Sequence, residues 1–345
     1  MEKKENVEKC PYVKKCGACH IGEKSYEEEL AEKKKQVIDN IGKYCKKIND
    51  VAGLYYPYHY RNKVHAVFGR RLDNGKDEVI AGTYAERTHM IIPVKDCLIE
   101  DTQASAIIQT VTKLVQSFRL WVYNEDTGRG LMRHVLVRKG ASTKQIMVVL
   151  VTASPEFPHK NHFVDRLREI HPEITTIVQN VNDKKTTMVL GDRNKVLYGK
   201  GYIDDVLLGL RFRISPGSFY QVNSAQTQVL YKKAIQAAGL TGTETVIDAY
   251  CGVGTIGMCM HAKAGRVLGI ELNEQAVKDA RANAKRNNLE HIQFVAADAT
   301  EYMTLMSQKG ERADVVVMDP PRSGSTQAFV KAAARIKPSP AKKCQ

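Results

Sequence analysis

A glycine-rich turn separates an apolar run from a helical segment in the second half of the chain. Gly252, Gly254 and Gly257 follow the apolar run 246–249. Glycines at this spacing let the backbone turn tightly and lie close to a ligand, and the start of the following helix offers unpaired N–H groups. The pattern is typical of a nucleotide-cofactor loop. A strand-to-helix turn without a ligand would show the same glycines, so the alternative stays open.

Acidic residues follow the next two apolar runs. Glu271 ends the run 267–271, and Asp298 comes shortly after the run 292–296. An acid at the end of the second strand of such a unit can bind the two hydroxyls of a ribose. Asn273 can cap the helix between the two runs. This strand-helix-strand unit fits an NAD enzyme and an S-adenosylmethionine enzyme equally well.

A fourth strand end favours methyl transfer. The apolar run 314–318 leads into Asp319-Pro320-Pro321-Arg322, where two prolines stiffen a loop that carries a carboxylate. Hydride transfer does not need such a loop, whereas methyltransferases use Asp/Asn-Pro-Pro-x. An aromatic fourth residue stacks on bases that are methylated on an exocyclic amine. Arg322 in that position argues against amine methylation.

Three thiols are grouped near the start of the chain. Cys10, Cys16 and Cys19 lie within ten residues, and Gly17 permits a tight fold between them. Cys97 is the candidate for a fourth ligand. The spacing departs from that of paired zinc ribbons and favours an iron–sulfur cluster without excluding zinc or free thiols. Cys45, Cys251 and Cys259 are predicted to be small buried side chains.

Helices and strands alternate irregularly in the first half. Ser25 and Glu28 form a capping box for a helix whose apolar side carries Leu30, Val37, Ile38 and Ile41. Asp101 can cap a second helix that runs towards Trp121. Strands are predicted within 131–151, in 175–181 and in 187–190. Arg133, His134 and Arg138 alternate with apolar residues, so one face of their strand could meet RNA.

The segment Tyr55–His65 interleaves tyrosines with Arg61 and Lys63. Such a mixture can stack bases and neutralise phosphates, although a sheet edge with exposed tyrosines would look similar. The chain has 52 Lys and Arg against 38 Asp and Glu, a net charge of +14, which suits a polyanionic partner or serves solubility alone.

The fold class follows from these elements. We expect a doubly wound, Rossmann-like α/β cofactor domain in 206–345, entered through a helix over 224–238, and an N-terminal α+β region in 1–205. No apolar stretch is long enough to span a membrane and no signal peptide is present, so a cytoplasmic protein with reduced cysteines is expected.

Three motifs in this order resemble the RNA uracil-C5 methyltransferases, the RumA/TrmA family, along nearly the whole chain. They are Phe219-Tyr220-Gln221-Val222-Asn223, the segment 248–254, and Asp319-Pro320-Pro321-Arg322-Ser323-Gly324. The resemblance implies that S-adenosyl-L-methionine is contacted by Gln221, Tyr250, Glu271 and Asp319, with Asp298 on the adenine. It further implies that Cys10, Cys16, Cys19 and Cys97 hold a [4Fe–4S] cluster, as in the ribosomal-RNA branch (RumA/RlmD-like).

The chemistry implied by the resemblance needs a cysteine and a carboxylate. A thiolate adds to carbon 6 of uracil, and carbon 5 then attacks the sulfonium methyl. A general base removes the carbon 5 proton, and the thiolate leaves carbon 6. The target base must also leave its stack to reach the site.

The sequence departs from the family at its end. The family's nucleophile lies in Ser-Cys-Asn-Pro after a fifth apolar strand, and its glutamate base follows. Here the chain reads Ser339-Pro340-Ala341-Lys342-Lys343-Cys344-Gln345. Cys344 lacks the strand that would position it, so we reject it as the nucleophile. The expectation is a truncated copy without its catalytic residues and without activity.

Three functions stay in view. The first is methylation of carbon 5 of a uridine in ribosomal RNA, the second a non-catalytic module that binds RNA and cofactor, and the third a small-molecule methyltransferase. The third is disfavoured by the charge and by the tyrosine-rich segment. No protein partner is implied, and a monomer is expected.

Overall fold

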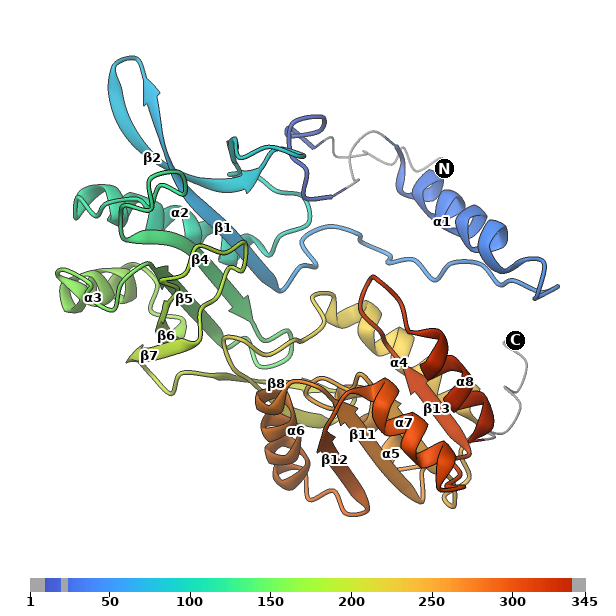
Figure 1. Ribbon diagram of the computed structural model, residues 1–345. Helices are drawn as coiled ribbons and strands as arrows, with labels where there is room; N and C mark the ends of the chain where they lie inside the picture. The colour runs from blue at the N-terminus through green and yellow to red at the C-terminus, as the bar shows by residue number, and fades with distance from the viewer. Residues whose placement is uncertain (1–9, 20–23, 337–345) are drawn as a thin grey trace. The chain divides into compact units, whose positions relative to one another are not determined.

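The computed structural model describes residues 10–19 and 24–336 (Figure 1). These residues form two compact units. The N-terminal unit comprises the described parts of 1–39, 53–203 and 215–217, and the C-terminal unit those of 40–52, 204–214 and 218–345. Within the described ranges, no helix is long and apolar enough to cross a membrane.

The described residues of the N-terminal unit build a seven-stranded mixed sheet in the order β3-β2-β1-β4-β5-β6-β7. All neighbours are antiparallel except β5 and β6, which are parallel and are connected through α3. The strands are β1 (Lys63–Asp73), β2 (Lys76–Tyr84), β3 (Ile91–Pro93), β4 (Met132–Lys139), β5 (Ile146–Thr152), β6 (Ile174–Val181) and β7 (Arg193–Tyr198).

Helices α2 (Thr102–Ser117) and α3 (Lys160–Ile170) supply the core of this unit. Asp101 caps α2, since its Oδ1 accepts hydrogen bonds from the N–H groups of Gln103 and Ala104, both at 3.1 Å. The apolar residues of α2 recur every three or four positions and therefore share one face. That face packs on the strands in a single cluster with Phe163 and Leu167 of α3.

The C-terminal unit is doubly wound. Its parallel sheet has the order β12-β11-β10-β13, from β10 (Thr245–Ala249), β11 (Arg266–Glu271), β12 (Ile292–Ala296) and β13 (Val315–Met318). The helices are α4 (Ser224–Ala238), α5 (Thr255–His261), α6 (Glu274–Arg286), α7 (Ala299–Gln308) and α8 (Gln327–Arg335), and a separate pair is formed by β8 (Ile203–Leu207) and β9 (Leu210–Ile214).

Successive strand residues point to opposite faces, so each face of the parallel sheet has its own core. Ile247, Ala249 and Ile270 pack against α7 and α8, where Met303 and Phe329 are fully buried. The intervening residues Val246 and Val267 pack with Met260 of α5 and with the inner side of α4. Because helices cover both faces of the sheet, the accessible part of the sheet is the line where its strands end.

The capping box of α1 (Tyr26–Ile41) is confirmed. Ser25 N–H donates to Glu28 Oε2 at 2.7 Å, and Glu28 N–H donates to Ser25 Oγ at 3.2 Å. The predicted apolar side of the helix is not a core face, because α1 has no buried residue and Val37, Ile38 and Ile41 are each 40–45% exposed.

Two predictions for the N-terminal unit are wrong. Residues 187–190 are not a strand. The strand in this part of the chain is β7, an edge strand with mostly exposed side chains, and its charged residues gave no apolar pattern from which to predict it. Arg133, His134 and Arg138 do not form an open basic face, because all three are buried. The second helix also ends at Ser117, before Trp121.

Candidate functional site

The glycine turn follows β10 and leads into α5. Tyr250, Gly252 and Gly254 all have positive φ, at 62°, 56° and 79°. A Cβ on Gly254 would lie 2.6 Å from the Phe294 ring, and one on Gly257 would lie 2.8 Å from Asp248 Oδ2. A Cβ on Gly252 would meet nothing within 4 Å. Gly254 and Gly257 therefore allow close packing, whereas Gly252 borders open space at the turn.

Asp248 lies beneath the turn. Its Oδ2 accepts the Gly257 N–H at 2.8 Å, and its Oδ1 is buried without a hydrogen-bond partner among the described residues. Burial raises the pKa of Asp248 to about 7, and the nearby carboxylates of Asp319 and Glu271 contribute to the rise. The sequence prediction assigned no role to Asp248. The sequence did carry a signal for this residue, because Asp248 is the one charged residue in the strand Thr245–Ala249.

Glu271 ends β11 and is held by backbone groups. Its Oε2 accepts the Gly252 N–H at 3.0 Å, and its Oε1 accepts the Asn273 N–H at 2.8 Å. In the parallel pairing of β10 with β11, Ala249 lies beside Ile270. The glycine turn and Glu271 therefore leave the sheet next to each other, at its carboxyl edge.

Asp319 joins this edge from the other side of β10. Ala249 pairs with Met318, so Tyr250 and Asp319 are the next residues of adjacent strands. Gln221 Nε2 lies 3.5 Å from Asp319 Oδ2, a contact between residues 98 positions apart. The Tyr250 ring packs against Phe329 of α8, with centroids 5.4 Å apart.

Asp298 lies two residues beyond β12 and caps α7. Its Oδ1 accepts the N–H groups of Thr300 at 2.8 Å and Glu301 at 3.0 Å. The pairing of Glu271 with Ala296 places the ends of β11 and β12 side by side. All five residues predicted to bind the cofactor thus belong to strand ends or segments at one edge of the parallel sheet. The carboxylates there could bind hydroxyl groups and complement a cationic ligand.

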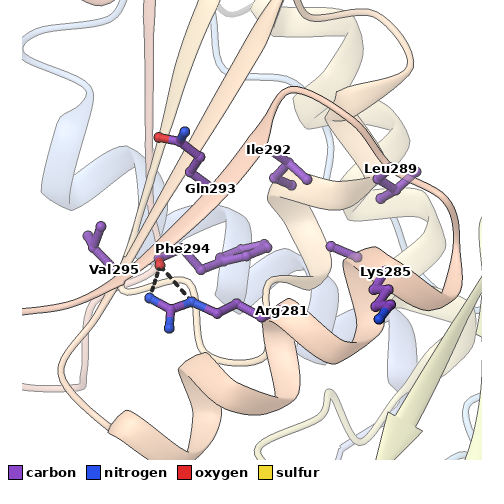
Figure 2. Close-up of a pocket in the computed structure, with 8 residues that line it drawn as sticks. Arg281, Lys285, Leu289, Ile292, Gln293, Phe294 and Val295 are labelled. Atoms are coloured by element: carbon purple, nitrogen blue, oxygen red, sulfur yellow. Dashed lines mark hydrogen bonds between the residues drawn. The ribbon is translucent and has the colours of Figure 1, made fainter.

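A pocket of about 560 Å³ lies elsewhere in this unit, between α6 and β12 (Figure 2). Arg281 donates from Nε and Nη2 to the Phe294 carbonyl, at 3.1 and 2.6 Å. Arg281 thereby satisfies a backbone acceptor of the edge strand. None of the predicted cofactor residues lines this pocket.

The four predicted cluster cysteines are each partly buried and carry free thiols. Tyr12 Oη accepts the N–H groups of Lys95 at 2.9 Å and Asp96 at 3.3 Å, which ties the first cysteine segment to the one with Cys97. Burial raises the pKa of Cys97 to about 11, with Glu100 and Cys19 adding to the rise. Burial also raises the pKa of Cys16, beside Cys19 and Cys10.

A metal needs these thiols as thiolates that converge on one centre. Within 10–19 and 24–336, no three His, Cys, Asp or Glu side chains are grouped closely enough to hold an ion. Burial and the neighbouring thiols raise the pKa values of Cys16 and Cys97, which works against the thiolate form. The described geometry does not close around an iron–sulfur cluster.

Two of the four tyrosines in the tyrosine-rich segment are exposed. Tyr55 is 97% exposed and Tyr56 is 56% exposed, and the rings of Tyr56 and Tyr58 meet edge-on at 5.2 Å. Only Lys63 onward belongs to β1. The exposed rings are free to stack on planar groups.

A family model described as a methyltransferase domain matches residues 240–339, which include the glycine turn, Glu271, Asp298 and Asp319. An uncharacterized RNA methyltransferase of Halalkalibacterium halodurans is 41% identical over 333 residues, covering 95% of this chain and 72% of that protein. A Listeria monocytogenes protein with the same description is 42% identical over 332 residues, with the same two shares.

A solved structure also matches most of the chain. It is the Pyrococcus abyssi tRNA (uracil-54, C5)-methyltransferase in complex with S-adenosyl-L-homocysteine. The two chains are 25% identical with a TM-score of 0.70, and the match covers 91% of this chain and 72% of the other.

Proposed function

The chain belongs to the RNA methyltransferase family, and we propose that it serves transfer of a methyl group from S-adenosyl-L-methionine to carbon 5 of a uridine in ribosomal RNA. The observation that carries this proposal is the shared sheet edge, where the glycine turn, Glu271 and the Gln221–Asp319 contact lie together. S-Adenosyl-L-methionine supplies an electrophilic methyl group on a sulfonium cation.

The assigned cofactor residues are Gln221, Tyr250, Glu271, Asp298 and Asp319. Glu271 is pre-oriented by two backbone N–H groups, which suits a carboxylate that receives ribose hydroxyls. Asp298 is fixed in the same way at the start of α7, as expected of a group on the adenine. The cationic ligand complements an edge lined by carboxylates.

Two observations favour carbon 5 of uracil as the target. The fourth residue of the Asp-Pro-Pro loop is Arg322, which lacks the aromatic ring that amine methylation uses. The structural neighbour from Pyrococcus abyssi acts on carbon 5 of a tRNA uracil. Because that neighbour acts on tRNA, ribosomal RNA and tRNA must be compared as substrates.

The thiols near the cofactor edge are unsuited to the addition step. Burial raises the pKa of Cys259 to about 12 and also raises that of buried Cys251, so both stay protonated at neutral pH. A nucleophile must ionise more readily than this. Cys344 lies outside the described residues. We therefore assign neither Cys251 nor Cys259 as the nucleophile.

The N-terminal unit is proposed to bind RNA and a [4Fe–4S] cluster. Exposed Tyr55 and Tyr56 and the net charge of +14 suit stacking on bases and contact with phosphates. Cys10, Cys16, Cys19 and Cys97 are the proposed cluster ligands. Tyr12 already joins their two segments, and cluster binding would require the thiols to ionise and converge.

The test is single-turnover transfer from labelled S-adenosyl-L-methionine, with unmodified ribosomal RNA and tRNA as separate substrates. The 345-residue chain is assayed beside a chain that also carries the family's cysteine- and glutamate-bearing segment. We expect the chain with this segment to form 5-methyluridine in ribosomal RNA and not in tRNA. Product only in tRNA would overturn the choice of RNA, and no product in either RNA would overturn the proposed methyl transfer.

Cofactor binding is measured separately by calorimetry. Glu271→Gln removes the charge at nearly constant size and should weaken binding by about 30-fold, as expected for a lost hydrogen bond to a charged group. Glu311→Gln, at an exposed position, is the matched control and should bind normally. Equal affinity of the two variants would contradict the assignment of Glu271.

A further inference from the structure

A cavity of about 260 Å³ lies in the N-terminal unit, among residues that the proposed methyl transfer does not use. Its walls come from β1, the end of β2, the segment 122–126 and the start of β4. The volume is below the roughly 300–1,000 Å³ typical of drug-sized ligands, so it suits one small planar group.

One wall of the cavity is a rigid loop. Tyr123 N–H donates to the Met132 carbonyl at 2.9 Å, and Asn124 N–H donates to the Arg129 carbonyl at 2.8 Å. Gly130 has φ +114°, and a Cβ there would lie 2.2 Å from the Val122 carbonyl oxygen. Only glycine permits this close return of the chain. The wall is therefore built before any ligand arrives.

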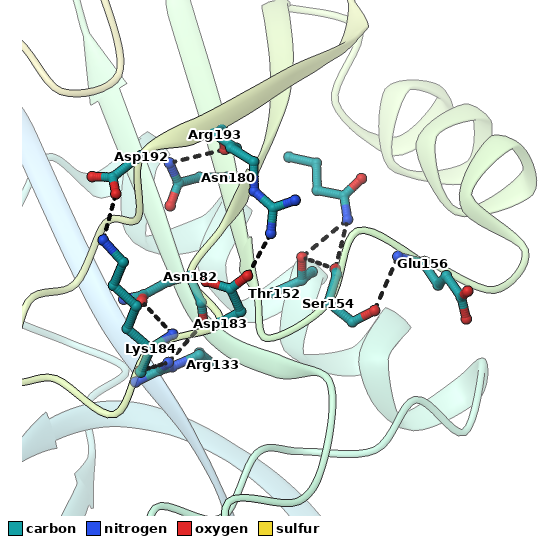
Figure 3. Close-up of polar contacts among 11 residues, drawn as sticks. Arg133, Thr152, Ser154, Glu156, Asn180, Asn182, Asp183, Lys184, Asp192 and Arg193 are labelled. Atoms are coloured by element: carbon teal, nitrogen blue, oxygen red, sulfur yellow. Dashed lines mark hydrogen bonds and ion pairs between the residues drawn. The ribbon is translucent and has the colours of Figure 1, made fainter.

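Arg133 gives one wall of the cavity a positive charge. Its side chain is held by the carbonyls of Asn182 and Lys184, which accept from Nη1 at 2.7 and 2.8 Å (Figure 3). The guanidinium lies 4.4 Å from the centroid of the Tyr123 ring. Arg133 is only 3% exposed, so its charge lies buried behind this wall of the cavity. A buried cation there favours a ligand whose facing edge carries electronegative atoms.

Glu125 gives the cavity a negatively charged hydrogen-bond acceptor. Its carboxylate lies 3.4 Å from His89 Nδ1, and the His89 ring meets the Tyr84 ring edge-on at 5.7 Å. Burial raises the pKa of Tyr84 to about 12, with Glu125 adding to the rise, so the phenol keeps its proton. The cavity thus combines carboxylate acceptors, a buried guanidinium charge and aromatic rings.

We propose that this cavity binds a guanine base from a single-stranded segment of the RNA, an inference that rests on the proposed RNA substrate. Guanine offers adjacent N1–H and N2–H donors for a carboxylate, and its O6 and N7 form an electronegative edge that the buried guanidinium charge attracts. Adenine lacks the N1–H and the N2 amine, and uracil carries a single N–H donor. Single-stranded bases are the ones that proteins read in this way.

The single tryptophan of the chain provides the readout. Trp121 is 71% exposed and directly precedes the cavity-lining segment 122–126. Its fluorescence is followed while two RNA octamers are added without cofactor, one of adenosines only and one with a single central guanosine. The guanosine octamer is expected to bind about tenfold more tightly, in keeping with one good base-specific contact.

Two variants test the residues. Glu125→Gln should remove the preference and leave affinity for the adenosine octamer unchanged, whereas Glu78→Gln, with the same charge change on the exposed part of β2, should retain it. His89→Ala alters a side chain that is 88% exposed and should reduce the preference without threatening the fold. Thermal melts confirm that each variant is folded.

A preference that survives both Glu125→Gln and His89→Ala would overturn the inference, as would equal affinity of the unaltered chain for the two octamers. In either case the proposed methyl transfer would still stand, since that assay measures product in the presence of cofactor. Failure to bind either octamer would instead count against RNA binding by this unit.

Discussion

The cofactor edge and the cysteine segments differ in how far their side chains are fixed by the rest of the fold. At the edge, Glu271 and Asp298 each accept two backbone N–H groups, so the carboxylates are oriented without a ligand. The thiols of Cys16 and Cys97 instead have raised pKa values and do not converge. The ends of parallel strands hold the carboxylates in place before any ligand binds, whereas the loops that carry the cysteines do not bring the described thiols together.

The largest expected effect concerns the cysteines. Anaerobic reconstitution with iron and sulfide should give about four irons per chain, visible absorption near 400 nm and a higher melting temperature, since ligand binding stabilises the folded state. Cys97→Ser should abolish all three changes, and Cys45→Ser should abolish none. Chelation should return the melting temperature to that of the unloaded chain. Iron uptake that survives Cys97→Ser would show that the contrast between the two sites is wrong.

Asp248 tests the cofactor edge through the pH dependence of stability. Its pKa is about 7 in the folded chain and near 3.8 when unfolded, so its contribution to stability is fully present below pH 4 and is lost as the pH rises towards 7. Asp248→Asn carries no such proton. It should be more stable than the unaltered chain above pH 7, by up to about 4 kcal/mol, and similar to it at pH 4.

Denaturant unfolding of the two chains at pH 4, 6 and 8 measures this difference. Asp73→Asn, at the exposed end of β1, is the control for the change in charge. Parallel pH profiles for Asp248→Asn and the unaltered chain would mean that Asp248 is already ionised beneath the turn.

A smaller effect separates two glycines of the same turn. Both have positive φ, but a Cβ on Gly254 would strike Phe294, whereas one on Gly252 enters open space. Gly252→Ala should lower the free energy of unfolding by about 1 kcal/mol, because only the backbone conformation becomes strained. Gly254→Ala should lower it by about 3 kcal/mol, because packing against Phe294 is also disturbed. Urea midpoints compare them. Equal costs would show that the turn rearranges rather than resisting the added methyl group.

The sequence predicted the C-terminal unit well because buried parallel strands are short apolar runs that end at glycine or acidic residues. The doubly wound fold, the Asn273 cap and the helix over 224–238 all follow from such local signals, and the structure confirms them. The assignment of cofactor residues was made by family resemblance and stays a prediction.

Features that depend on distant partners were missed. β7 is an edge strand that pairs with β6, but its charged side chains do not show the pattern of a strand. Helix α1 has an apolar stripe, but none of its residues is buried. The contact between Gln221 and Asp319 joins residues 98 positions apart, which no local pattern encodes. Asp248 was visible as a charge in an apolar strand, but its raised pKa depends on burial and on neighbours from other strands.

The separation of Gln221 from Asp319 also orders events during synthesis. Closing a loop of 98 residues costs roughly 4 kcal/mol of chain entropy, so the contact forms only once β13 is in place to support it. A ribosome must therefore release Asp319 from its exit tunnel before the nascent chain has a complete cofactor edge. Until then, Gln221 and helix α4 lack strand β13, which brings Asp319 to the edge of the sheet.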